Sequence, residues 1–318
     1  MATMKAMVIP EANKMFELRD VEVPEPKAGE VLLKVEACGV CHGDSMAVGG
    51  MASSYPRIPG HEVVGHIAKL GEGVEDLEVG ARAGIGWHAG NGGVTGLSRD
   101  GGYAEYMTAE AASLVTIPEE LASAEAAPLL CAGQTVFSAL RASSARPGDL
   151  VAVLGIGGLG HLAVQYAHKA GFEVAAISRG QSKQALALEL GANHYLDNAD
   201  GSAADKLKEL GGAQVLLVTS PNPDVIKPLI AGVKTGGEMI FAATSTDPIG
   251  WSTMDFIGTG ANVHGTFTNA DELERTLKFS TLFDVKPRIE TFSLEQAGEA
   301  YSKMMAAKTK FRGVLVMD

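Results

Sequence analysis

The sequence is poor in three features, each of which would have indicated a class of protein. It has 3 cysteines in 318 residues, an odd and small number that argues against a disulfide framework. No uninterrupted apolar run approaches the length of a membrane span, since glycines interrupt the richest stretch, 150–164. Residues 1–10 lack the apolar segment and cleavage site of a signal peptide. We therefore expect a cytoplasmic protein with no membrane partner.

The chain also lacks an excess of positive charge. It carries 26 Lys and Arg against 38 Asp and Glu, a formal net charge of -12 at pH 7. Binding to phosphates needs a basic face, so we expect no nucleic-acid partner. Apolar residues make up 46% and charged residues 20%, which is typical of globular proteins, and 318 residues suit two domains.

The pattern of apolar residues changes along the chain. The first part has the composition of strands and turns, with expected strands at 5–9, 31–37, 62–70 and 78–87. From residue 133 strands alternate with helices. The expected strands are 150–154, 173–178, 192–196, 214–218, 238–242 and 262–265, and the expected helices are 160–170, 181–190, 203–210 and 223–234. This alternation predicts a parallel sheet with right-handed crossovers, and hence the α/β class.

Three distant residues, Cys41, His61 and Cys131, each lie in a short context suited to holding one metal ion. The contexts are Gly-Val-Cys-His-Gly-Asp at 39–44, Pro-Gly-His-Glu at 59–62 and Pro-Leu-Leu-Cys-Ala-Gly at 128–133. Two thiolates, one imidazole and an open position are typical of a catalytic zinc, because a structural zinc fills all four positions with protein ligands.

A glycine-rich run follows the expected strand 150–154 directly. Its sequence is Gly155-Ile156-Gly157-Gly158-Leu159-Gly160, and a helix and a second strand come after it. Glycine clusters often mark only turns, but this context favours a dinucleotide site. Gly155 would allow the tight turn, Gly157 the approach of a pyrophosphate, and Gly160 the close packing of helix and strand. The helix N-terminus would offer free N–H groups to the phosphates.

The end of the second strand indicates which dinucleotide is preferred. NAD sites place Asp or Glu there to bind the ribose 2′-hydroxyl, whereas this chain has Ser178-Arg179-Gly180 followed by Lys183. This position holds no carboxylate, which would repel a 2′-phosphate. The guanidinium of Arg179 can instead pair with the 2′-phosphate bidentately. We therefore predict NADP in preference to NAD. The alternative is that Arg179 and Lys183 only cap a solvated helix.

Together, the four motifs at 39–44, 60–62, 131–133 and 155–160 resemble those of the zinc-dependent medium-chain alcohol dehydrogenases. The similarity runs in order through nearly the whole chain. It implies a β-rich GroES-like catalytic domain and a Rossmann domain, a doubly wound parallel sheet, with the active site in the cleft between them. The implied boundaries are 1–132 for the catalytic domain, 133–267 for the NADP-binding domain, and 268–318 for a C-terminal return to the catalytic domain, in which we expect helices at 271–279 and 294–307.

The resemblance also implies roles for single residues. Cys41, His61 and Cys131 would bind one zinc ion, and Glu62 is a carboxylate that can approach it during ligand exchange. Asp44 would orient His61, a type of partner that most metal-binding histidines have.

Three further roles follow from the same resemblance. Trp87 would line the substrate pocket, Thr135 would lie near the nicotinamide, and Arg312 would reach the cofactor pyrophosphate. Met46, Met51 and Tyr55 would suit an apolar pocket, although methionines at such positions are more often plain packing.

Two features depart from the family pattern. The family carries Ser or Thr directly before Asp44, where its hydroxyl passes a proton outward, but this chain has Gly43. A water with His42, whose imidazole can carry a proton, or alternatively Ser45 could replace it, or proton transfer is simply slow.

The second departure is a missing lobe. Many relatives bind a structural zinc with four cysteines in a lobe that follows Trp87, whereas residues 89–100 contain no cysteine and Asn91-Gly92-Gly93 there predicts a tight turn. We expect one zinc per subunit. Whether the short form is natural or engineered stays open, as does the choice between a homodimer and a homotetramer.

The expected activity is the interconversion of alcohols with aldehydes or ketones by hydride transfer to and from the nicotinamide. A zinc-free reductase of quinones or activated alkenes is one alternative, and a non-catalytic NADP-binding protein is another, since fold does not imply function. Cys38, His66 and His88 match no ligand position, so we interpret Cys38 as an inert buried thiol and both histidines as packed or surface residues.

Overall fold

A computed structural model of the chain describes residues 2–91, 93–266 and 268–317. The chain forms two compact units. Unit 1 comprises Met1–Cys131 and Asn269–Asp318, and unit 2 comprises Ala132–Thr268. The domain boundary expected at residue 267 lies outside the described residues, as do the chain ends at 1 and 318 and the central glycine, Gly92, of the expected turn.

Unit 1 is a mainly antiparallel β-structure. Its main sheet has the order β14-β15-β3-β4-β5-β7, with β6 also paired to β3, and β1 and β2 form a separate ladder. The strands are β1 (Thr3–Val8), β2 (Glu17–Glu22), β3 (Glu30–Val40), β4 (Val63–Leu70), β5 (Arg82–Ile85), β6 (Tyr106–Glu110), β7 (Val115–Thr116), β14 (Ile289–Ser293) and β15 (Arg312–Val316). The helices are α1 (Asp44–Met46), α2 (Ser123–Ala126), α9 (Ala270–Phe283) and α10 (Ala297–Met305), with a wide turn at Ala47–Met51.

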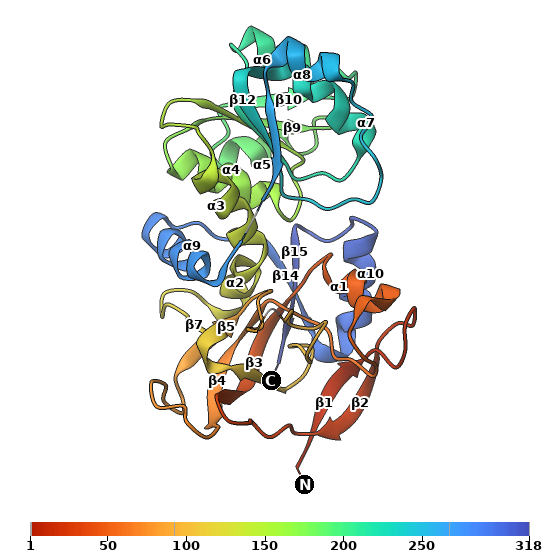
Figure 1. Cartoon of the computed structure of the whole chain (residues 1–318), viewed down its shortest axis with the longest axis vertical. Helices are drawn as coiled ribbons and strands as arrows, with labels where there is room; N and C mark the ends of the chain where they lie inside the picture. The colour runs from red at the N-terminus through yellow and green to blue at the C-terminus, as the bar shows by residue number, and fades with distance from the viewer. Residues whose placement is uncertain (1, 92, 267, 318) are drawn as a thin grey trace. The chain divides into compact units, whose positions relative to one another are not determined.

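The end of the chain belongs to unit 1. Strand β15 pairs antiparallel with β3, so that Val314 lies opposite Gly39. In Figure 1 this last segment, in blue, lies beside the red strand β3. Residues near 40 and residues near 313 are therefore neighbours in space, although most of the chain separates them.

Unit 2 is a parallel sheet flanked by helices, with strand order β10-β9-β8-β11-β12-β13. The strands are β8 (Leu150–Leu154), β9 (Glu173–Ser178), β10 (His194–Asp197), β11 (Ala213–Val218), β12 (Val233–Phe241) and β13 (Asn262–Gly265). The helices are α3 (Ala132–Ala142), α4 (Gly160–Lys169), α5 (Gln184–Glu189), α6 (Ala203–Glu209), α7 (Pro223–Ile226) and α8 (Thr253–Thr259). Strand β8 is buried throughout, as expected for a strand covered on both faces. The predicted fold class, a doubly wound parallel sheet with a β-rich domain, is confirmed.

The prediction of one helix over 223–234 was wrong in its second half. Helix α7 ends at Ile226, a 3-10 turn covers Lys227–Gly232, and β12 starts at Val233. Pro228 has no N–H to donate, which interrupts the α-helical ladder at this point. Strand β12 also contains Gly236, which has φ of 75°, at a place where the register with β11 shifts.

Within the described residues, no helix combines the length and the apolar character that crossing a membrane would require.

Candidate metal centre and nucleotide-binding loop

The residues predicted to bind metal meet at one end of the β3–β4 pair in unit 1. Cys41 directly follows β3, and His61 and Glu62 directly precede β4. Because the two strands are antiparallel and Cys38 lies opposite Val63, the end of one strand lies beside the start of the other. Cys131 follows the 3-10 turn Ala127–Leu130. One ligand atom from each of the four residues lies within 4.8 Å of the others.

The spacing of the two sulfurs fits a shared ion. The Sγ atoms of Cys41 and Cys131 are 3.9 Å apart, and both cysteines are free thiols. Two thiolates on one tetrahedral zinc, each about 2.3 Å from the ion, lie ~3.8 Å apart. The distance is far longer than the ~2.05 Å of a disulfide, so the pair suits metal binding rather than cross-linking.

His61 presents a nitrogen to this cluster. Its Nδ1 lies 3.0 Å from Oδ1 of Asp44, and both side chains are buried. Asp44 is thus the acceptor that fixes the tautomer, which leaves Nε2 with its lone pair. Nε2 is buried without a hydrogen-bond partner among the described residues. A buried unpartnered nitrogen is costly unless a ligand satisfies it, so this atom fits a metal.

Glu62 and Arg312 form a buried ion pair beside the same cluster. Nη2 of Arg312 donates to Oε1 of Glu62, and the side chain of Glu62 is fully buried. Oε2 of Glu62 has no hydrogen-bond partner in the described part of the chain. Burial raises the pKa of Glu62, an effect that the charge of Arg312 opposes. The structure therefore places Arg312 within unit 1 at Glu62, and its predicted contact with the cofactor stays a prediction.

The two thiols titrate as a pair. The hydrogen bond from Cys131 lowers the pKa of Cys41 well below its usual value, an effect that burial opposes. The same hydrogen bond and burial raise the pKa of Cys131 well above its usual value. A cation bound between them favours loss of both protons.

The glycine-rich run of unit 2 connects β8 to α4. Gly155 has φ of 91°, a conformation that favours glycine. A Cβ on Gly160 would lie 1.7 Å from the carbonyl oxygen of Gly155, so the helix can approach the strand only through a glycine here. At Gly157 a Cβ would meet nothing within 4 Å. The open side of the loop is thus at Gly157, where the fingerprint predicts the pyrophosphate.

The turn after β9 is held from two sides. Nζ of Lys183 donates to the carbonyl oxygen of Ile156 in the glycine-rich run at 2.8 Å. The N–H of Gly180 donates to Oδ1 of Asp197, the register partner of Ser178 on β10, at 2.8 Å. Between these anchors the side chain of Arg179 is exposed. Sequence analysis missed Asp197, because strand pairing rather than chain order brings this carboxylate to the turn.

Comparisons with known proteins identify the family of the chain. A zinc-binding dehydrogenase model matches residues 158–281, and an alcohol dehydrogenase GroES-like domain model matches residues 27–119. The chain is 37% identical to the alcohol dehydrogenase notN of Aspergillus sp. (strain MF297-2), over 99% of this chain and 98% of that protein. It is 36% identical to an alcohol dehydrogenase of Geobacillus stearothermophilus, over 98% of each. The chain belongs to the zinc-type medium-chain alcohol dehydrogenase family.

A solved structure supports the same assignment. The alcohol dehydrogenase of the archaeon Aeropyrum pernix has a TM-score of 0.88 at 27% identity, over 98% of this chain and 99% of that one. The family resemblance predicted from the motifs is therefore confirmed, including a GroES-like domain. Membership makes the chain an alcohol oxidoreductase that uses a nicotinamide cofactor and acts on a small molecule.

In this alcohol dehydrogenase, the position before Asp44 leaves little room for a side chain. A Cβ on Gly43 would lie 2.9 Å from Cε1 of His61 and 3.0 Å from Cζ3 of Trp87. The Trp87 ring meets the His61 ring edge-on, with centroids 4.9 Å apart. Trp87 thus packs on a residue of the cluster. The side chain of His42 is exposed.

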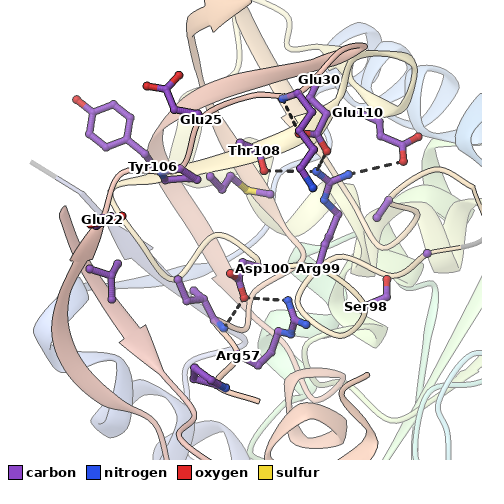
Figure 2. Close-up of a pocket in the computed structure, with 18 of the residues that line it drawn as sticks. Glu22, Glu25, Glu30, Arg57, Ser98, Arg99, Asp100, Tyr106, Thr108 and Glu110 are labelled. Carbon is purple, nitrogen blue, oxygen red and sulfur yellow. Dashed lines mark hydrogen bonds and ion pairs between the residues drawn. The ribbon is translucent and has the colours of Figure 1, made fainter. Parts of the chain in front are cut away.

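Polar contacts hold the segment 89–100, the short connection noted in the sequence. Nη2 of Arg99 donates to Oε1 of Glu30 at 2.8 Å, and its Nη1 lies 3.8 Å from Oε1 of Glu110. Nη1 of Arg57 donates to Oδ1 of Asp100 at 2.9 Å. Figure 2 shows these pairs lining a cavity of about 680 Å³. Ion pairs to neighbouring strands therefore anchor this segment without cysteines.

The remaining sequence candidates fall on separate elements. Thr135 is half-buried on α3, which packs against α4 in unit 2. Cys38 is buried on β3, where burial raises its pKa well above the usual value, as expected of an inert thiol. His66 pairs with Glu36 at 3.0 Å. In the turn expected at 91–93, the N–H of Gly93 donates to the carbonyl oxygen of Gly90 at 2.7 Å.

Proposed function

We propose that this protein is a zinc-dependent alcohol dehydrogenase or aldehyde reductase that prefers NADP to NAD. Its proposed reaction is hydride transfer between the carbon of an alcohol, aldehyde or ketone and C4 of the nicotinamide. The proposal rests chiefly on one observation, the buried and unpartnered Nε2 of His61 beside two free thiols. We expect one zinc per subunit, because within the described residues one such ligand group is found.

Zinc bound at Cys41, His61 and Cys131 would supply a Lewis acid that polarises the oxygen of the substrate. The residues of the chain prepare that position. Asp44 holds the proton on Nδ1 of His61, so Nε2 stays available as a ligand. The two thiols lose their protons when a metal binds. Arg312 occupies Oε1 of Glu62 and leaves Oε2 free to approach the metal site.

The path of the substrate proton is the least conventional part of the proposal. Gly43 provides no hydroxyl, and the packing of Trp87 and His61 leaves little space for one. We propose that a water with His42, or alternatively Ser45, passes the proton to solvent. His42 is exposed and Ser45 is half-buried, so both can reach water.

The NADP preference rests on the exposed guanidinium of Arg179 at the end of β9. Lys183 adds a second positive charge, held against the glycine-rich run through Ile156. Asp197 places a negative charge at the same turn, but its oxygens accept hydrogen bonds from Gly180, Gln181 and Ala199. We therefore propose that Ser178, Arg179 and Lys183 receive the 2′-phosphate, and that the NADP preference favours aldehyde reduction.

The two units would have separate roles in the reaction. We propose that residues 1–132 and 268–318 form the catalytic domain, and that residues 133–267 bind the cofactor, with Thr135 near the nicotinamide. Trp87 would contact the substrate, since its ring already packs against His61.

We propose a homodimer or a homotetramer, to be distinguished by light scattering. The free thiols support a reducing, cytoplasmic location.

Replacement of one metal ligand tests the proposal. Cys41→Ala should lose zinc and lower alcohol-dependent NADP reduction by about three orders of magnitude, since a Lewis-acid metal contributes several kcal/mol to the transition state. Binding of NADPH, followed by its fluorescence, should change little. Cys38→Ala is the matched control, because this thiol is buried outside the cluster, and it should retain zinc.

The rival functions predict different results. A zinc-free reductase would keep its turnover of quinones or activated alkenes in Cys41→Ala. A non-catalytic binding protein would show full zinc and NADPH occupancy in the unaltered chain, with no turnover of any alcohol or aldehyde in a broad panel. Either result would contradict the proposed function.

A further inference from the structure

Tyr103 lies at the metal cluster, although nothing in its sequence context marks it as a functional residue. Its ring is fully buried, and its hydroxyl donates to Oδ2 of Asp44 at 2.9 Å. The residue comes just before β6, 59 positions from Asp44 in the sequence. A fully buried tyrosine places its hydroxyl only where a partner exists, and here the partner is the carboxylate that holds His61.

Three donors from three segments hold the carboxylate of Asp44. Oδ1 accepts from Nδ1 of His61 at 3.0 Å. Oδ2 accepts from the backbone N–H of Cys41 at 2.9 Å and from the hydroxyl of Tyr103. Two of the donors therefore belong to residues of the metal cluster. The third, Tyr103, is outside it and reaches it through the carboxylate of Asp44.

The position of Tyr103 is itself fixed by its surroundings. Its N–H donates to the carbonyl oxygen of Pro59 at 3.0 Å, and its own carbonyl accepts from Met7 at 2.8 Å. The ring of Phe16 packs edge-on against it, with centroids 5.7 Å apart. Gly60 has φ of 101°, and a Cβ there would lie 2.4 Å from the tyrosine ring. The glycine directly before His61 thus makes the space that Tyr103 fills.

We propose that Tyr103 is a positioning residue of the metal site, which fixes the carboxylate of Asp44 and through it aims Nε2 of His61 at the two thiols. The inference rests on the proposed function, because it takes that cluster as the zinc site. Removal of the hydroxyl leaves Oδ2 with the single N–H of Cys41, so the carboxylate is free to rotate away from His61. Burial, together with the charge of Asp44, raises the pKa of Tyr103 well above its usual value, so the hydroxyl remains a donor at working pH.

The test separates the hydroxyl from the ring. Tyr103→Phe keeps the ring and its packing, and it should weaken zinc binding about tenfold in competition with a chromophoric chelator. Loss of a residue that orients a metal ligand typically costs 10–100-fold in affinity, and Tyr103 is one contact further away. In the cobalt-loaded protein the visible ligand-field bands should shift. The KM for NADPH should stay unchanged, because the cofactor site lies in unit 2.

Tyr301→Phe is the matched control. Tyr301 packs edge-on against the same ring, Phe16, with centroids 5.5 Å apart. No hydrogen bond joins its hydroxyl to Asp44 within the described residues. This variant should bind zinc like the unaltered protein. If it weakens zinc binding as much as Tyr103→Phe does, the effect does not come from the hydrogen bond between Tyr103 and Asp44, and the inference is overturned.

A double-mutant cycle with Asp44→Ala tests the route through the carboxylate. If Tyr103 acts through Asp44, adding Tyr103→Phe to Asp44→Ala should weaken zinc no further. Additive effects would contradict the proposal. Should Asp44→Ala fail to fold, the comparison of Tyr103→Phe with Tyr301→Phe remains decisive. If these two variants bind zinc with affinities that agree within twofold, the inference is overturned.

Failure of the inference and failure of the proposed function give different results. Zinc binding by the unaltered chain without alcohol or aldehyde turnover overturns the proposed function, while the affinity comparison still tests Tyr103. Turnover with zinc, together with an unchanged affinity in Tyr103→Phe, overturns only the inference. If the unaltered chain binds no zinc, both are wrong.

Discussion

The metal cluster of unit 1 and the glycine-rich loop of unit 2 are built in opposite ways. The cluster takes its four side chains from three segments, at 41, 61–62 and 131. The loop is one continuous run, 155–160, between β8 and α4, and its proposed ligand would be held by backbone N–H groups. A site made of side chains depends on every contact that positions those side chains. A site made of backbone atoms depends mainly on the absence of Cβ atoms that would block the approach of a ligand.

The two sites also differ in the charges that they bury. The cluster buries His61, Glu62 and Arg312, with Nε2 of His61 and Oε2 of Glu62 unpartnered in the described part of the chain. Such groups are costly unless a ligand satisfies them. At the loop of unit 2, by contrast, the hydroxyl of Thr219 lies 2.8 Å from the carbonyl oxygens of Leu154 and Gly155. We therefore expect unit 1 to depend on its ligand for stability more than unit 2 does.

The largest effect on stability should come from a Cβ placed between the glycine-rich loop and helix α4. Gly160→Ala places a Cβ 1.7 Å from the carbonyl oxygen of Gly155, an overlap that backbone movement must relieve. We expect a loss of about 3 kcal/mol, and a fall in Tm on the order of 10 °C by calorimetry.

Gly157→Ala is the matched control, since its Cβ meets nothing within 4 Å. This variant should fold normally and lose affinity for NADPH, because the pyrophosphate needs that space. If both variants were equally stable, the distinction between a packing glycine and a binding glycine would be wrong.

The next effect separates the two units directly. Removal of the metal with a chelator should speed amide exchange on the order of tenfold in the segments around 39–62 and 127–131. Peptides covering 150–180 in unit 2 should change little. Hydrogen-exchange mass spectrometry measures both in one sample. Equal acceleration in the two units would show that the metal site does not stabilise unit 1 in particular.

The smallest effect concerns the choice of cofactor. Arg179→Ala should raise the KM for NADPH about tenfold, near the lower end expected for a charge-assisted hydrogen bond at an exposed site. The KM for NADH should change less than twofold. Steady-state kinetics with both cofactors measures this, and Lys14→Ala, on the surface of unit 1, is a charge-matched control. Equal changes for NADPH and NADH would remove the case for a 2′-phosphate site.

The two regions were not equally open to prediction from sequence. The loop was predictable because its residues are contiguous, and both its flanking strand and its helix carry clear local patterns. For the cluster, the ligand residues could be proposed from motifs, but their environment could not. The contact of Arg312 with Glu62 depends on the pairing of β15 with β3, while its expected contact with the cofactor stays a prediction. The contact of Tyr103 with Asp44 joins residues 59 positions apart, and no local pattern indicates it.

What the sequence alone predicted correctly is the alternation of strands and helices in unit 2, the position of the glycine-rich run and the family, because all of these are encoded over short stretches. What only the tertiary structure decided is which side chains share a buried environment. The orphaned Nε2 of His61, the pairing of Glu62 with Arg312 and the tight space at Gly43 arise where strands far apart in the chain lie side by side. Hydrogen bonds and desolvation act over a few ångströms of space rather than along the chain, so the electrostatics of the site exist only once the sheet has formed.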